Sequence, residues 1–520
     1  MSLSARPRRL PGRSRRLSAA LLASAVSVCL LAASAPPAPL GVGDRLFPHL
    51  GNPGYDVASY DLSFTYSGSN DKPLQAVTTI DGWTTEALES LNLDFTHGEV
   101  RSVEVDGEPA AFTAAGEDLV ITPRKPLPRG DWMRVTVRHT SDPVSDEDRD
   151  GGWLRTADGL AMANQADAAH LVFPSNDHPS DKAMFTIRVT APEGYTAVAN
   201  GLATDVKRTT RATTWTYRTQ HPMATELAQI SIGRSTVTRR EGPHGLPVRD
   251  VVPTKDREAL EPWLKKTPDQ IGWMESKVGP YPFETYGVLI ADAATGFELE
   301  TQTLSLFEKG LFTEPAYPQW YVESIMVHEL AHQWFGDSVT PRTWSDLWLN
   351  EGHATWYEAL YAEEKADRTL EARMKAAYGA SDRWRTAGGP PGAPKPPAPG
   401  QKIGIFRSNV YDGAALVLFA LRETIGVQAF DRLERAWVRD HRDANASTAD
   451  FRHLAEEVSG RDLGTFFQEW LYAEKTPAMP GHPEWKAATA TARTPAVKAA
   501  EDTRAHGPDQ AREPGHGAGR

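Results

Sequence analysis

Two short motifs, spaced so that they must fold against each other, constrain this chain more than any other feature. The first runs from His328 to His332 with the pattern His-Glu-x-x-His, and the second runs from Leu349 to Gly352 as Leu-Asn-Glu-Gly. Residues four apart lie on one face of a helix, so His328 and His332 can bind the same metal ion. Glu351, nineteen residues after His332, supplies a third ligand if a second helix folds back on the first. The motifs therefore predict a zinc site with three protein ligands and an open fourth position.

A five-residue motif of this kind also arises by chance, so its surroundings must decide between a metal site and histidines that only pack. Apolar residues recur at helical spacing over residues 320–335, and a Gly-Asp pair follows that can end the helix. A turn containing proline leads to a second apolar helix over about residues 345–362. Two antiparallel helices with a short connection return Glu351 to the histidines, which favours the metal site. Glu329 then lies beside the ligands as the candidate general base.

These motifs resemble peptidase family M1, a family of zinc aminopeptidases in the gluzincin clan, which also holds thermolysin. The matching stretches are residues 328–337 and 344–352, with the family's gap of eighteen residues before the glutamate. Residues 279–283, Gly-Pro-Tyr-Pro-Phe, resemble the segment that leads into the family's catalytic domain. Residues 173–179 resemble a degenerate form of its Pro-x-x-Asp-Glu-Pro element. The resemblance implies one Zn²⁺ per chain, bound by His328, His332 and Glu351.

The resemblance also implies a multidomain α+β protein, in which an all-β N-terminal domain precedes a thermolysin-like, mainly helical zinc catalytic domain. Alternating strand patterns over residues 45–240 and helical patterns over residues 246–475 agree with this order. The family often carries a large helical C-terminal domain, and we expect a short form that lacks it and has a more open cleft. Residues 476–520 are rich in Ala, Pro, Gly and charge with one tryptophan, which predicts a disordered tail.

Three further residues receive roles from the resemblance. Tyr411, sixty residues after the glutamate ligand, corresponds to the family tyrosine that stabilises the oxyanion. Glu300 is the one residue kept in place from the family's Gly-Ala-Met-Glu-Asn motif and would bind the substrate's free α-ammonium group. Gln165, nine residues before Pro174, aligns with a family Gln or Glu that also holds this amine. The alternatives are a core tyrosine at 411 and an ordinary loop residue at 165.

The chain departs from the family pattern at several of these positions. Glu298 replaces a small residue and Thr301 replaces the asparagine of the exopeptidase motif. The second glutamate could strengthen amine binding or could simply face solvent. Gly413 stands where family members often have a basic residue, and Ala414 stands where they have glycine.

The first 35 residues differ in composition from the rest of the chain. Six arginines precede an uncharged run over residues 17–35, a pattern typical of a secretory signal peptide, by the Sec or the twin-arginine route. The alternative is an uncleaved membrane anchor, because the run is just long enough to span a bilayer. Removal of these six arginines would change the net charge from −12 to about −18. Such an acidic mature chain argues against nucleic acid and against anionic membrane surfaces as partners.

Three functions are compatible with this pattern. The first is an exported, secreted or extracytoplasmic, zinc aminopeptidase whose partners are peptides with a free N-terminus. The second is a thermolysin-like endopeptidase on the same zinc site, favoured by the open cleft and by the altered motif at residues 297–301. The third is a non-catalytic binding module, which is disfavoured because every predicted ligand, Glu329 and Tyr411 are present.

Overall fold

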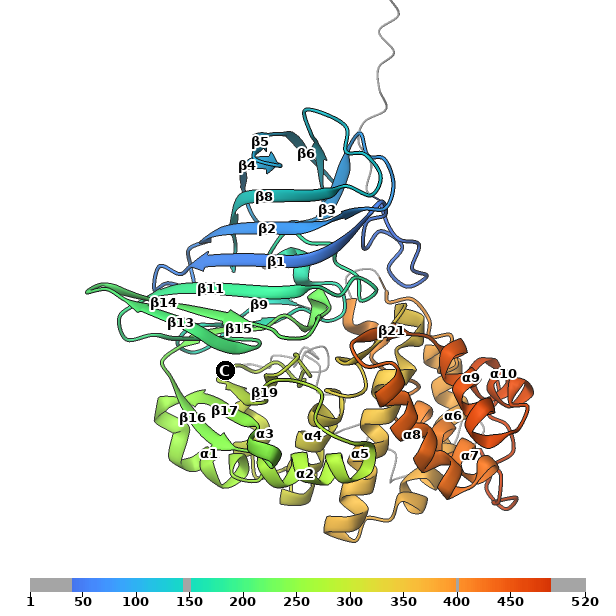
Figure 1. Cartoon of the computed structure of the whole chain (residues 1–520). Helices are drawn as coiled ribbons and strands as arrows, with labels where there is room; N and C mark the ends of the chain where they lie inside the picture. The colour runs from blue at the N-terminus through green and yellow to red at the C-terminus, as the bar shows by residue number, and fades with distance from the viewer. Residues whose placement is uncertain (1–39, 144–150, 399–401, 488–520) are drawn as a thin grey trace, which may run out of the picture. The chain divides into compact units, whose positions relative to one another are not determined.

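The computed structural model describes residues 40–143, 151–398 and 402–487. The predicted signal segment and residues 488–520 of the predicted tail lie outside these ranges. Strands make up the regular structure as far as residue 253, apart from short 3₁₀ turns, and the α-helices of the described chain all follow residue 256 (Figure 1). The predicted fold, a strand-rich domain followed by a mainly helical one, is confirmed. Among the described residues, no helix is long and apolar enough to cross a bilayer.

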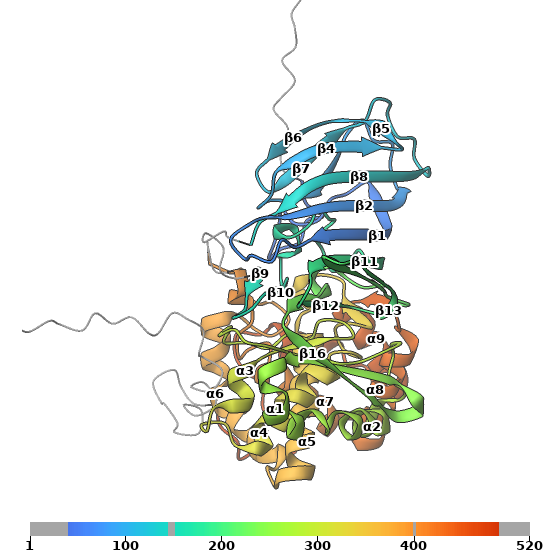
Figure 2. The same ribbon diagram turned by 90° about the vertical axis from the view of Figure 1, so that its left-hand side faces the viewer.

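An eight-stranded sheet dominates the first part of the chain, in the order β13-β14-β11-β1-β2-β8-β4-β5. Its strands are β1 (Tyr55–Thr65), β2 (Leu74–Thr84), β4 (Val100–Val105), β5 (Glu108–Pro109), β8 (Trp132–Ser141), β11 (Met184–Pro192), β13 (Leu202–Arg208) and β14 (Ala212–Arg218). β1 pairs with β11 in parallel and with β2 in antiparallel orientation. Figure 2 shows β1, β2 and β8 side by side. Buried and more exposed positions alternate along most of β1, because successive side chains of a strand point to opposite faces.

Two smaller sheets complete the β domain and share its apolar core. The first, in the order β3-β7-β6, consists of β3 (Leu91–Asp94), β7 (Asp118–Thr122) and β6 (Ala111–Ala115). The second, in the order β12-β15-β10-β9, consists of β12 (Thr196–Ala199), β15 (Ile230–Gly233), β10 (Leu160–Ala163) and β9 (Gly152–Arg155). The 3₁₀ turns η1 (Ala169–Leu171) and η2 (Thr225–Leu227) lie between these strands in sequence.

A four-stranded sheet crosses the predicted boundary between the domains. It contains β16 (Ser235–Glu241), β17 (Pro247–Pro253), β18 (Val288–Ala291) and β19 (Ser305–Glu308), in that order. β16 and β17 form an antiparallel hairpin, and the following pairs are parallel. The predicted border between residues 240 and 246 therefore falls in the turn of one hairpin, whose strands satisfy each other's backbone hydrogen bonds. The structure places β16 with the catalytic sheet.

Ten α-helices form the rest of the described catalytic domain. They are α1 (Arg257–Leu264), α2 (Thr267–Val278), α3 (Lys309–Thr313), α4 (Gln319–Ala331), α5 (Trp348–Ala366), α6 (Leu370–Gly388), α7 (Asp412–Ile425), α8 (Val427–Asp440), α9 (Thr448–Ser459) and α10 (Gly464–Tyr472). Short elements between them are η5 (Trp344–Asp346), β20 (Val339–Pro341) and β21 (Ala444–Ala446). α4 is buried along most of its length, because it runs through the centre of the apolar core.

The predicted disordered tail begins too early. Trp485 is only 5% exposed. Its ring stacks on Phe419 of α7 with centroids 5.8 Å apart and also contacts Tyr378 of α6 at 5.9 Å. One buried indole removes a large apolar area from water, so it can hold a segment that has no regular hydrophobic period. Residues 476–487 therefore pack on the helical domain.

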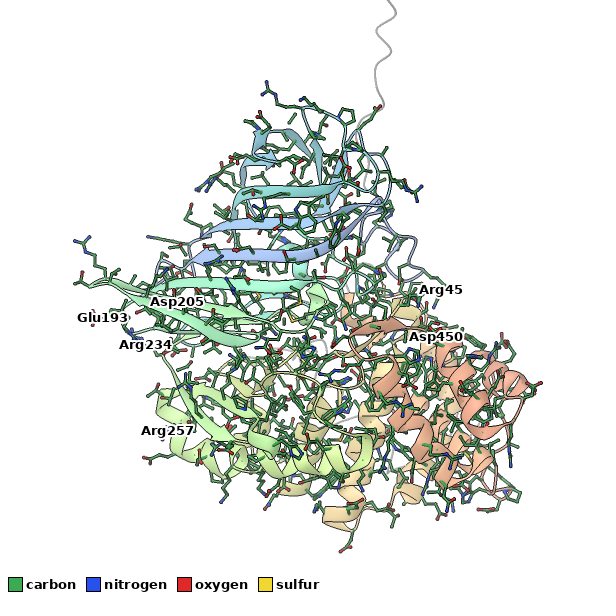
Figure 3. All side chains as sticks on the ribbon, viewed as in Figure 1. Arg45, Glu193, Asp205, Arg234, Arg257 and Asp450 are labelled. Atoms are coloured by element: carbon green, nitrogen blue, oxygen red, sulfur yellow. The ribbon has the colours of Figure 1, made fainter. Side chains whose placement is uncertain are left out.

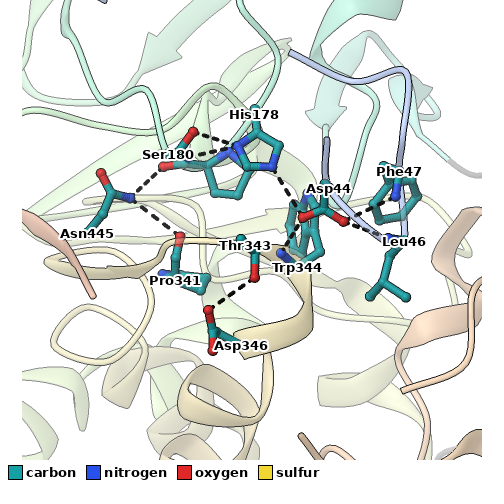
Figure 4. Close-up of polar contacts among 11 residues, drawn as sticks. Asp44, Leu46, Phe47, His178, Ser180, Pro341, Thr343, Trp344, Asp346 and Asn445 are labelled. Atoms are coloured by element: carbon teal, nitrogen blue, oxygen red, sulfur yellow. Dashed lines mark hydrogen bonds and ion pairs between the residues drawn. The ribbon is translucent and has the colours of Figure 1, made fainter. Parts of the chain in front are cut away.

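Asp44 ties the start of the described chain to the loop before α5 (Figure 4). Its carboxylate accepts hydrogen bonds from the backbone N–H groups of Leu46 and Trp344 at 2.7 and 2.8 Å. It also lies 3.3 Å from Nε2 of His178. Burial alone would raise the pKa of Asp44, but these hydrogen bonds outweigh it and lower the pKa. The edge of Phe47 packs on the ring of Trp344, which fixes the entry to α5.

Most charged side chains lie outside the core, as Figure 3 shows for Glu193, Asp205 and Arg257. All three are exposed. Buried carboxylates are costly unless they find partners, so those that the chain does bury need an explanation. Two groups of them stand out, one in the β domain and one around α4 and α5.

Candidate active site

α4 and α5 bring the three predicted metal ligands together. Nε2 of His328 lies 3.4 Å and Nε2 of His332 lies 3.5 Å from Oε2 of Glu351. Each of the three side chains is at most about one-twentieth exposed. Tetrahedral ligands about 2.0–2.1 Å from a zinc ion lie roughly 3.3–3.4 Å from one another. The two His–Glu separations therefore fit a zinc ion, and the ligand atoms of all three residues lie within 4.8 Å of one another.

The other ring nitrogen of each histidine is also engaged. Nδ1 of His328 lies 3.1 Å from Oε2 of Glu358, and Nδ1 of His332 lies 3.1 Å from the backbone oxygen of Phe335. An Nδ1–H donated to these oxygens leaves the Nε2 lone pair facing the metal position. Sequence analysis missed Glu358. The signal was available, because Glu358 lies seven residues after the glutamate ligand and so about two turns along the same face of α5.

A close contact between α5 and α7 brings Tyr411 to the ligands. A Cβ added at Gly352 would lie 2.8 Å from Cβ of Ala414, so the two helices approach to a distance that only small residues allow. Tyr411 immediately precedes α7, and its ring stacks on His328 with centroids 5.9 Å apart. Ala414 stands where the family pattern has glycine, and its small side chain still permits the close approach of α5 and α7.

Glu300 and Gln165 meet beside the metal ligands. Nε2 of Gln165 donates a hydrogen bond to Oε1 of Glu300 at 2.6 Å. Ligand atoms of Glu300, Glu329 and His332 lie within 4.8 Å of one another. Gln165 also lies 3.3 Å from Oε2 of Glu226, a carboxylate that is 2% exposed. Sequence analysis missed Glu226, since no local pattern marks a residue that reaches the site only through the fold.

The surroundings of Glu329 suit a general base. Burial raises its pKa well above the ordinary value, and Glu300 raises it further against the opposing charge of His332. A carboxylate with a raised pKa accepts a proton from water more readily. Glu351 differs, because the two histidines outweigh the effect of burial and lower its pKa to about 2. The environments of Glu329 and Glu351 therefore shift the pKa values of these two neighbouring carboxyl groups in opposite directions.

Five buried carboxylates define what we call the active-site cluster: Glu226, Glu300, Glu329, Asp337 and Glu351. Asp337, which sequence analysis treated only as a helix end, is fully buried, and neither of its carboxylate oxygens has a hydrogen-bond partner in the described chain. Lys182 donates instead to the backbone oxygen of Asp337 at 2.8 Å. Burial and then the charge of Glu300 raise the pKa of Asp337 well above its ordinary value. This concentration of carboxylates favours cations, whether a metal ion or an ammonium group.

Other histidines near the motifs have structural partners. His353, which follows the glutamate ligand closely, stacks on Phe335 with centroids 4.4 Å apart and is fully buried. Nδ1 of His170 lies 2.7 Å from Asp177 in the β domain.

The tryptophans at 334, 344, 348 and 356 are almost completely buried. They therefore belong to the core.

Comparison with known proteins agrees with this arrangement. Residues 160–227 match the Peptidase M1 N-terminal domain, and residues 264–470 match the Peptidase family M1 domain. Glutamyl aminopeptidase of Mus musculus is 26% identical over 310 residues, which cover 57% of this chain and 33% of the relative. Aminopeptidase N of Streptomyces lividans is 25% identical over 448 residues, which cover 80% of this chain and 50% of the relative. The chain thus spans about a third to a half of the length of these curated relatives.

A solved structure is similar over nearly its whole length. The M1 zinc metallopeptidase of Deinococcus radiodurans superimposes with a TM-score of 0.71 and 28% identity, covering 85% of this chain and 98% of that one. A mutant of that enzyme bound to a Tyr-ser-ala substrate gives the same TM-score. The fold and the site of two histidines and one glutamate are those of the gluzincin class. Within that class, the chain belongs to peptidase family M1.

Proposed function

We propose that this protein is an exported zinc aminopeptidase that hydrolyses N-terminal residues from peptides. The observation that carries the proposal is the placement of Glu300 beside Glu329 and His332, in hydrogen-bond contact with Gln165. A carboxylate so close to the reacting centre can bind an α-ammonium group and so limit hydrolysis to the first peptide bond. The names of the relatives and the tripeptide bound to the Deinococcus enzyme support peptides as substrates.

Each residue of the site has a role in this proposal. One zinc ion per chain, held by His328, His332 and Glu351, would polarise the scissile carbonyl and acidify a water molecule. Glu329 takes a proton from the attacking water and transfers it to the leaving amine. Tyr411 donates its hydroxyl proton in a hydrogen bond to the developing oxyanion.

Glu300 and Gln165 fix the substrate's N-terminus. The Glu300 carboxylate accepts hydrogen bonds from the ammonium group, and the side-chain amide of Gln165 holds that carboxylate in place. Glu226, on the other side of Gln165, adds negative charge behind the pair. This arrangement pairs a positive group with a buried carboxylate, whose charge would otherwise be unfavourable.

One peptide in free and N-acetylated forms tests the proposal. Zinc-loaded protein is incubated with each form, products are identified by mass spectrometry, and Glu329→Gln serves as the inactive control. We expect stepwise loss of residues from the free form alone. Internal cuts in both forms would instead establish the endopeptidase alternative, and no cleavage of either form with zinc bound would favour a non-catalytic module.

Export is the part of the proposal that rests on sequence alone. The arginines and the uncharged run of residues 1–35 support it. Expression of the full chain, cell fractionation and N-terminal sequencing of the recovered protein test it. An extracytoplasmic product that starts near residue 36 is expected, and an intact N-terminus in the cytoplasmic fraction would refute it.

A further inference from the structure

The segment before Glu300 carries a second glutamate on the same face. Leu299 pairs with Leu306 of β19, with N–H···O distances of 2.9 and 2.7 Å in the two directions. Side chains alternate between the faces of an extended segment. Leu299 is buried in the apolar core, so Glu298 and Glu300 project from the opposite face. This is the face on which Glu300 meets Gln165.

Glu300 places this shared face beside the site. Ligand atoms of Glu300, Glu329 and His332 lie within 4.8 Å of one another. Glu298, two residues before Glu300 in an extended segment, therefore projects to the same side as the carboxylate proposed to bind the substrate amine.

Glu298 has no cationic partner in the described ranges of the chain, although its side chain is half-buried. The neighbouring acid Glu308 is already engaged, because its Oε2 accepts hydrogen bonds from the backbone of Thr295 and Gly296 at 3.0 and 2.9 Å. Burial and the charge of Glu308 raise the pKa of Glu298 to about 8. A cation placed beside Glu298 would stabilise its ionised form.

We infer that Glu298 is a specificity-determining residue that binds the ammonium or guanidinium group of a lysine or arginine at one of the two substrate residues flanking the scissile bond. The inference rests on the proposed aminopeptidase function and names its substrate class. Cα atoms two residues apart in an extended segment lie about 6.6–6.8 Å from each other. A peptide held by its amine at Glu300 and extended along this segment has its first two residues within reach of Glu298. A small residue at this position could not make the contact.

Matched peptides test the inference. They share one sequence with a free N-terminus and carry either lysine or norleucine, which has a similar chain without the ammonium group, at position 1 or position 2. For the zinc-loaded wild-type protein, we expect kcat/KM to be about 10-fold higher for lysine than for norleucine at one of these positions, as for a partly buried ion pair. Glu298→Gln should reduce this ratio to about 1. The ratio cancels any general effect of the substitution on turnover.

Glu314→Gln is the matched control, because it removes one exposed negative charge from the same part of the chain. It should keep the wild-type lysine preference, which distinguishes a local ion pair from the general negative field. An equal lysine preference in Glu298→Gln and wild type would overturn the inference, and so would the absence of any lysine preference in wild type. If the wild-type protein cleaves neither the lysine peptides nor the norleucine peptides, the proposed function itself is refuted. Thermal unfolding of each variant verifies that it is folded.

Discussion

The two groups of buried carboxylates in this protein are alike in burial and different in their partners. The β-domain cluster consists of Asp94, Asp118, Asp177 and Asp181, each at most 6% exposed. Asp177 accepts hydrogen bonds from the backbone of His170 at 3.0 Å and from Thr225 at 2.8 Å. The other three likewise accept from backbone N–H groups and from asparagine side chains.

The active-site cluster is less completely satisfied, although Gln165 donates to Glu300 and to Glu226. Hydrogen-bond partners are missing within the described chain for Oε2 of Glu329, Oε2 of Glu351, Oε1 of Glu226 and both carboxylate oxygens of Asp337. Among the described carboxylate oxygens of the β-domain cluster, only Oδ1 of Asp118 is buried without a hydrogen-bond partner. Buried polar atoms normally find partners, so a group of unsatisfied carboxylates indicates a place that binds something else. The β-domain carboxylates thus have hydrogen-bond partners within the fold, whereas the active-site cluster leaves several oxygens available to a bound group.

Loss of the catalytic base should give the largest effect. Glu329→Gln removes the proton acceptor, and we expect kcat to fall by about 1,000-fold. Because the substitution also removes an unsatisfied buried carboxylate, the free energy of unfolding should stay the same or rise. Peptide hydrolysis and urea denaturation, both with zinc present, measure the two quantities. A variant that loses stability together with activity would break the distinction between the clusters.

The opposite result is expected for the β-domain cluster. Asp177→Ala leaves the donors of His170 and Thr225 without an acceptor, and it should lower the free energy of unfolding by about 3 kcal/mol. Urea denaturation measures the change. Asp205→Ala, at an exposed position of β13, is the control and should change stability by less than about 0.5 kcal/mol. A small loss at Asp177, equal to that of the control, would contradict the structural role.

Removal of the amine-binding charge should have an intermediate effect. Glu300→Gln keeps the shape of the side chain and one acceptor for the amide of Gln165. We expect kcat/KM on the free peptide to fall by about 30-fold, as for the loss of a charged hydrogen-bond partner. Activity on the N-acetylated peptide should remain equally low in both proteins. If the variant keeps full activity on the free peptide, another group binds the amine.

The smallest effect expected per measured step is a change in how stability depends on pH, taken over one pH unit. Burial and the charge of Asp177 raise the pKa of Asp94 to about 8. Between about pH 4 and pH 8 the folded protein therefore holds one proton that the unfolded chain has released, so the free energy of unfolding falls as pH rises. Asp94→Asn cannot ionise and should reduce this slope by up to about 1.4 kcal/mol per pH unit. Denaturation curves at pH 5, 6.5 and 8 measure it, and identical slopes would disprove the assignment.

The helix pair of the site could be predicted because its signals are local. A four-residue spacing puts His328 and His332 on one face, and a short connection returns Glu351 to them. The helix ends were less accurate: α4 ends at Ala331 and α5 begins at Trp348, because a 3₁₀ turn separates the predicted start from the helix. The order of strands in the large sheet could not be predicted, since pairing joins segments far apart in the sequence.

The residues that surround the ligands could not be derived in the same way. Glu226 reaches Gln165 across 61 positions of sequence, and the pairing of Arg373 with Glu358 joins two helices. No periodicity encodes such contacts. The segment around Trp485 was predicted to be disordered from its composition. In the structure, the side chain of Trp485 packs on the core. Sequence analysis thus named the three residues that the structure brings together, but it missed Glu226, Glu358 and Asp337 around them.

The hydrogen bond between Asp44 and the backbone of Trp344 spans 300 positions of the chain. A ribosome adds about 5–20 residues per second, so roughly 15–60 seconds separate the synthesis of these two partners. Glu351 is made later still, and until then the histidines lack their third ligand. A nascent chain that has not yet reached residue 351 therefore lacks one of the three residues that could hold a metal ion.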